Sequence, residues 1–172
     1  RLNARGEASG TLLPDLRLQA RFTLPPGDLE GRPVKGQGRL RYESRHLADA
    51  DIDLNLAGNL AKLTGAFGRV GDRFTWDIDA PELGRLRLGL AGRLTSRGNV
   101  SGDPALPQIE AVLAASGLRL PGDVAADTLN LKLDLQAAAT GAFNGQLDAR
   151  GVTLAGQRLS SVRATAQGRR NA

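Results

Sequence analysis

Few residues of this chain could carry chemistry, and none of them forms a recognisable catalytic pattern. The 172 residues include one histidine, His46, and no cysteine, so a thiolate metal site and a disulfide framework are both excluded. No serine or carboxylate accompanies His46 in the pattern of a nucleophilic triad, and we expect it to be a surface turn residue. The sequence therefore predicts a protein that is not an enzyme, with no catalytic residue and no cofactor.

Three alternating aspartates are the best candidates for a metal site. Asp49, Asp51 and Asp53 share one face of a predicted strand, whereas a calcium loop needs carboxylates that converge from a tight turn containing glycine. We therefore expect a solvated face and no metal. Gly36-Gln37-Gly38 begins like a dinucleotide-binding fingerprint, but Arg41 stands where the third glycine would be. Nucleotide binding is not predicted either.

The charge of the chain raises the question of an anionic partner. The formal net charge is +5, but the arginines are spread singly with Asp or Glu nearby, and no run is longer than Arg169-Arg170. Aromatic residues on which bases could stack are scarce, with four Phe, one Tyr and one Trp. We predict a solvated sheet face and no nucleic-acid partner; a diffuse attraction to anionic headgroups or to nucleic acid is the alternative.

An alternation of apolar and polar residues organises the whole chain. Leu86, Leu88, Leu90 and Leu94 recur at even spacing with arginines between them, which places them together on one face of a strand but on opposite sides of a helix. We predict a half-buried strand there. The same period is clearest from 48 to 58 and returns near both ends of the chain.

Turn residues divide this pattern into segments. Pro25-Pro26-Gly27-Asp28 is predicted to end a strand, residues 68–72 to form a hairpin loop, and residues 101–107 to connect two strands. Residues 81–84 fit one helical turn as well as they fit a strand, since proline suits the first position of a helix. The turn signals lie mostly 9 to 14 residues apart, so the sequence predicts an all-β meander of about eleven to thirteen strands.

Two stretches fit a helix as well as a strand. Residues 59–67 and 109–117 have apolar residues at helical as well as alternating spacing, and alanine and leucine favour helices. We assign both to strands because their neighbours are strands. The chain has no Met and begins at Arg1, so we expect a piece of a longer polypeptide, with residues 1–172 forming a single segment.

The apolar face of such a sheet must be covered. A membrane barrel would need aromatic girdles that this composition cannot supply, and no strong amphipathic helix is available as a cover. Folding over as a filled sandwich is one alternative. A leucine-lined, glycine-rich sheet that curves into a trough is favoured, because small residues permit curvature and leave space between the walls. An apolar cargo such as an acyl chain would complete its core.

Four stretches follow one another in an order that is found in a known family: residues 76–83, 92–111, 116–120 and 149–168. Over Phe74 to Gly168, this succession resembles the TamB family, the translocation and assembly module subunit of bacterial envelopes. It implies a long, U-shaped hydrophobic β-groove in the periplasm of a Gram-negative bacterium, with an inner-membrane anchor outside this fragment.

The resemblance also implies a function. It predicts a conduit for phospholipid acyl chains towards the outer membrane, with a TamA-like outer-membrane barrel protein as partner. The alternative is a chaperone-like scaffold for autotransporters and other outer-membrane proteins, which would bind their unfolded strands. By position, the groove lining would be Leu16, Leu18, Phe22, Ile52, Leu54, Leu56, Phe74, Trp76, Ile78, Leu86, Leu88, Leu90, Leu129, Leu131, Leu133, Leu135 and Leu147.

Overall fold

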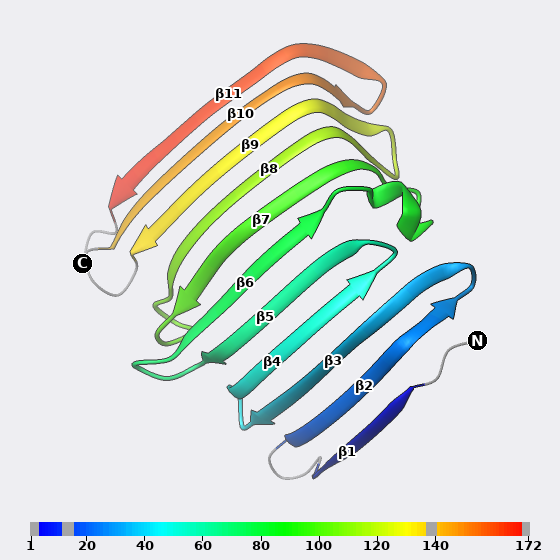
Figure 1. The fold of residues 1–172 in the computed structure, drawn as a ribbon. Coiled ribbons are helices and arrows are strands. Elements are labelled where there is room, and N and C mark those ends of the chain that lie inside the picture. Colours follow the sequence, from blue (N-terminus) through cyan, green and yellow to red (C-terminus); the bar gives the residue numbers. More distant parts are fainter. Residues whose placement is uncertain (1–3, 12–15, 137–140, 170–172) are drawn as a thin grey trace.

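In the computed structural model, which describes residues 4–11, 16–136 and 141–169, the chain forms one curved antiparallel sheet (Figure 1). Its eleven strands lie in chain order, each paired with the next. Among the described strands the sheet is not closed into a barrel, and β1 and β11 are its first and last strands. The strands are β1 (Arg5–Thr11), β2 (Arg17–Leu29), β3 (Arg32–Glu43), β4 (His46–Leu56), β5 (Asn59–Phe67), β6 (Arg73–Ala80), β7 (Ala91–Ser101), β8 (Gln108–Leu120), β9 (Val124–Gln136), β10 (Ala142–Leu154) and β11 (Gln157–Arg169).

The predicted fold class, an all-β curved meander, is confirmed. A 3-10 helix, η1 (Leu83–Leu86), lies between β6 and β7. None of the described segments is a helix with the length and apolarity needed to span a membrane. The ambiguous stretches form β5 and β8, as predicted, and residues 68–72 and 102–107 connect strands.

Four of the hairpins turn over two residues. Both central residues have positive φ at Glu30-Gly31, Ser44-Arg45, Ala57-Gly58 and Ala155-Gly156, as type I′ turns require. This geometry matches the right-handed twist of the flanking strands and keeps successive strands adjacent.

The prediction that the double proline ends a strand is wrong. β2 continues through Pro25 and Pro26 to Leu29, and its pairing with β3 shifts between Leu24 and Gly27. A bulge at this point tolerates residues that cannot donate a ladder hydrogen bond. The turn therefore falls at Glu30 instead.

The strand predicted from the leucine alternation around Leu88 is also wrong in its first half. β7 begins at Ala91, and the residues before it form η1 and an irregular connection. Arg87 and Gly89 have positive φ, which breaks an extended strand. The helical spacing of the leucines and the preceding Pro81 favour the turn that the structure shows.

The last four strands share an irregularity, which we call the crease. Elsewhere in these strands, the apolar residues that share one side of the sheet are two positions apart. Where the four strands lie opposite one another, this spacing becomes three, between Ala115 and Leu118, Ala126 and Leu129, Ala149 and Val152, and Leu159 and Val162. The alternation of buried and exposed residues shifts by one position at the same place, since Ala126 is buried, Asp127 is exposed and Leu129 is the next partly buried residue. Because all four strands carry the extra residue, their register is preserved across the crease.

His46 is not the surface residue that we predicted. Its side chain is buried, and its Nε2 lies 2.9 Å from a carboxylate oxygen of Asp72. The same oxygen accepts the backbone N–H of Arg69 at 2.8 Å, and the Asp72 carbonyl accepts the N–H of Gly102. These bonds tie three connections together at the rim opposite η1.

Candidate functional site

One face of the sheet is apolar across its whole length. Residues directly opposite each other in an antiparallel pair share a face, so the register can be followed from strand to strand. One such row contains Leu24, Gly36, Leu54, Ala61, Ile78, Ser96, Leu113, Leu131, Leu147 and Ala164. The next row contains Phe22, Gly38, Ile52, Leu63, Trp76, Gly98, Ala111, Leu133, Gly145 and Ala166. We call this side the apolar face.

The other side, the polar face, is held by cross-strand ion pairs. Arg39 Nε lies 2.9 Å from an Asp49 oxygen, and Arg97 Nε lies 3.1 Å from an Asp77 oxygen. The hydrogen bond from Arg163 lowers the pKa of Asp148, with a further contribution from Gln146. Exposed pairs of this kind contribute little to stability.

Within residues 4–11, 16–136 and 141–169, no second layer covers the apolar face. Among the described residues the buried hydrophobic side chains are mostly alanines, and no large side chain is fully buried. Large residues stay partly exposed, with Leu18 and Leu131 at 37% and Phe143 at 40%. A sandwich with a filled interior would bury these residues completely. The structure is therefore the curved sheet with an uncovered face and not the filled sandwich.

The apolar face is concave at the crease. Ala115, Ala126 and Ala149 flank the crease and are only 4–8% exposed, although no other layer lies over them. Side chains converge on the inner side of a bent sheet, so small residues there are covered by their own neighbours. The bend therefore folds towards the apolar side.

Aromatic side chains lie over glycines on this face. A methyl group added to Gly98 would overlap the Trp76 ring, and the same holds for Gly38 beneath Phe22. The Trp76 indole N–H donates to the Ser96 hydroxyl at 3.0 Å. The rings consequently lie against the sheet rather than standing up from it.

The structure places the predicted lining residues in two groups. Those that fall in strands all lie on the apolar face: Leu18, Phe22, Ile52, Leu54, Leu56, Phe74, Trp76, Ile78, Leu129, Leu131, Leu133, Leu135 and Leu147. Leu16 comes just before β2. Leu86, Leu88 and Leu90 lie in η1 and the connection after it, so they do not extend the rows. The role of the set as a cargo path stays a prediction.

Our prediction missed other residues of the same face. Leu40, Leu63, Leu94, Ile109, Leu113 and Phe143 lie on the apolar face, as do Leu118, Val152 and Leu159 beyond the crease. Their alternation was visible in the sequence for the first six. For the last three, the signal was the three-residue step between apolar positions.

The polar face carries open hollows, and none of those formed by the described residues has recognisable chemistry. One hollow is bordered by Arg97, Val112 and Lys132, and its neighbour by Lys62 and Asp77. Within the described ranges, no three His, Asp or Glu side chains are grouped to hold a metal ion. Asp49 and Asp51 of β4 both pair with Arg39 on the polar face.

Comparison with known proteins gives one match. A family model described as TamB, N-terminal domain, matches residues 2–172. Neither the curated proteins nor the solved structures contain a match to the chain. The family match thus extends over the first seventy residues, beyond the stretch in which we found a resemblance.

Proposed function

This chain belongs to the TamB family, and from that premise we propose that its apolar face shields phospholipid acyl chains as they pass between the inner and outer membranes. The family is envelope-associated and is linked to the TamA module. In this proposal the chain works in the periplasm beside a TamA-like barrel, and it acts as a surface without catalysing a reaction or using a cofactor.

The observation that supports this function is the apolar face without a cover. Each methylene that leaves water for such a surface contributes about 0.8 kcal/mol. The rows run across the strands, so at about 4.8 Å per strand the path from β2 to β11 extends roughly 43 Å. A lipid tail lying along a row would stay in contact with apolar side chains throughout.

Photocrosslinking tests the path. A photoreactive amino acid at Leu131 in the full-length protein is expected to yield lipid adducts, because this side chain is on the apolar face and 37% exposed. The matched control places the same photoreactive amino acid at the next position, in place of Lys132 on the polar face. Mass spectrometry identifies the adducts, and equal lipid recovery from both positions would refute the proposal.

The uncovered apolar face also supports a second candidate function, the chaperone-like scaffold. In this alternative, the apolar side chains of unfolded outer-membrane strands lie against the face in place of lipid tails. Peptide adducts from the crosslinker at Leu131, with no lipid, would favour the scaffold.

A further inference from the structure

The connection between β6 and β7 crosses one rim of the sheet, and we call residues 81–90 the strap. Figure 1 shows η1 beside the hairpin turns at this rim. The strap reaches back to the β2–β3 turn through hydrogen bonds that span 54 and 57 residues. In the other direction, a methyl group on Gly89 would lie 3.5 Å from Pro121 in the β8–β9 turn.

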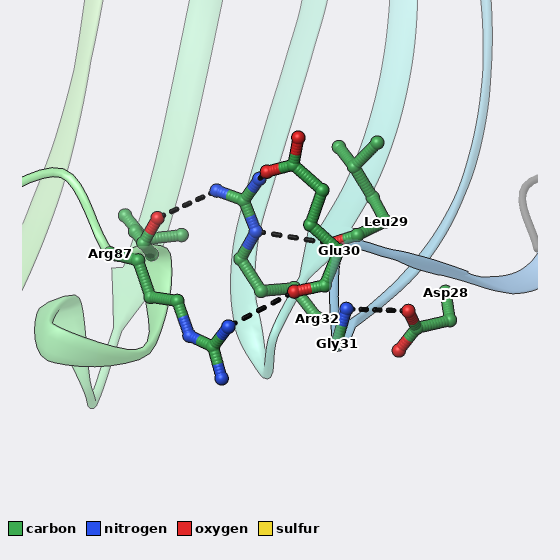
Figure 2. Close-up of polar contacts among 7 residues, drawn as sticks. Asp28, Leu29, Glu30, Gly31, Arg32 and Arg87 are labelled. Atoms are coloured by element: carbon green, nitrogen blue, oxygen red, sulfur yellow. Dashed lines mark hydrogen bonds and ion pairs between the residues drawn. The ribbon is translucent and has the colours of Figure 1, made fainter.

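Two arginines form a clasp between the strap and the β2–β3 turn (Figure 2). Arg32 of β3 donates to the Leu86 carbonyl of the strap at 2.8 Å, and Arg87 of the strap donates to the Glu30 carbonyl at 3.1 Å. Arg32 also donates to the Leu29 carbonyl and pairs with the Glu30 carboxylate. Its side chain is 13% exposed, so these charge-assisted bonds are partly shielded from water.

A buried asparagine makes a second attachment. Asn59, the first residue of β5, donates from its amide to the Glu82 carbonyl at 3.1 Å and accepts the Glu82 N–H at 3.2 Å. The Arg85 guanidinium lies 3.8 Å from the position of a methyl group on Gly58. The strap therefore lies against the β4–β5 turn, whose residue Ala57 is 2% exposed and donates its backbone N–H to the Pro33 carbonyl.

The strap is weakly held compared with the strands. Leu83 is its one buried residue, and Leu88 is 60% exposed. Arg87 has a φ of 55°, a left-handed conformation that costs a non-glycine residue free energy. A segment with few buried contacts opens before the sheet does.

We propose that the strap is a releasable cover for this rim of the apolar face, held closed by the clasp of Arg32 and Arg87. The strap links β3 and β5 to the start of β7 without taking part in the strand ladder. Release of the clasp frees the strap from the β2–β3 turn and leaves the Asn59–Glu82 bonds to hold it, so the rim around Ala57 is expected to open more often while the ladder stays intact.

Thiol labelling in the full-length protein tests this proposal without reference to any cargo. Cysteine replaces Ala57 under the strap or, as a reference, Ala149, which is equally buried but lies by the crease. Arg32→Lys combined with Arg87→Ala is expected to raise the labelling rate at Ala57→Cys about tenfold, since charged hydrogen bonds are lost. The rate at Ala149→Cys is expected to stay unchanged.

Arg97→Ala is the matched control for the loss of an arginine, because Arg97 pairs with Asp77 across β6 and β7 on the polar face. It is expected to leave both labelling rates near those of the parent protein. An unchanged rate at Ala57→Cys in the clasp variant, or an equal rise at Ala149→Cys, overturns the proposal. If the double variant does not fold, Arg87→Ala alone applies the same test.

Discussion

Leu131→Arg in the full-length protein is expected to reduce the phospholipid that copurifies with it by at least tenfold. Leu131 lies in the middle of an apolar row, between Leu113 and Leu147, and a guanidinium there would bring its hydration water onto the path. Because the leucine is partly exposed, the arginine can extend its charged end into solvent, and the protein is expected to remain folded with a loss of about 1 kcal/mol or less. Lipid mass spectrometry and thermal unfolding measure the two effects.

Val112→Arg is the control for this experiment. Val112 is 49% exposed and lies on the polar face, next to Leu113 in the chain. The same substitution there is expected to preserve lipid retention. Equal lipid content in the two variants would mean that the apolar face is not the path.

The second large effect is expected from Gly98→Val. The new side chain would overlap the Trp76 ring and meet the Glu110 carbonyl, which is backbone and cannot swing away. Overpacking of this kind costs about 3 kcal/mol in the free energy of unfolding. The displaced indole also loses its bond to Ser96, so its fluorescence emission should shift to longer wavelength, alongside a lower denaturant midpoint.

Gly145→Val separates this contact from a general effect of filling a glycine. Gly145 lies in the same row, but an added methyl group there would find its nearest atom 3.9 Å away, on Leu133. Valine suits a strand, and we expect a change within about 1 kcal/mol. A loss at Gly145 as large as at Gly98 would contradict the stacking explanation.

The sequence predicted the faces of the strands well, because side-chain period depends only on local backbone geometry. The leucines of β9, for example, lie on one face as their spacing indicated. Local period does not say where a strand ends. Pro25 therefore lies inside β2, where a bulge accommodates it. The leucines around Leu88 were assigned to a strand, but β7 begins only at Ala91.

The features that the sequence did not reveal depend on distant partners. His46 is buried beside Asp72, its partner 26 residues further along the chain. The strap is held by Arg32, whose partner carbonyl is 54 residues further along the chain. Neither pairing leaves a periodic signal, so no local pattern could have predicted it.

The crease has a consequence for how this stretch of sheet can change over generations. A residue lost at Gly117 alone would leave β8 one position out of step with β9, and its remaining side chains would exchange faces. A hairpin duplicated from β2 and β3 would bring no matching extra residue. We therefore expect an insertion, deletion or duplication that preserves the sheet to affect all four of these strands together.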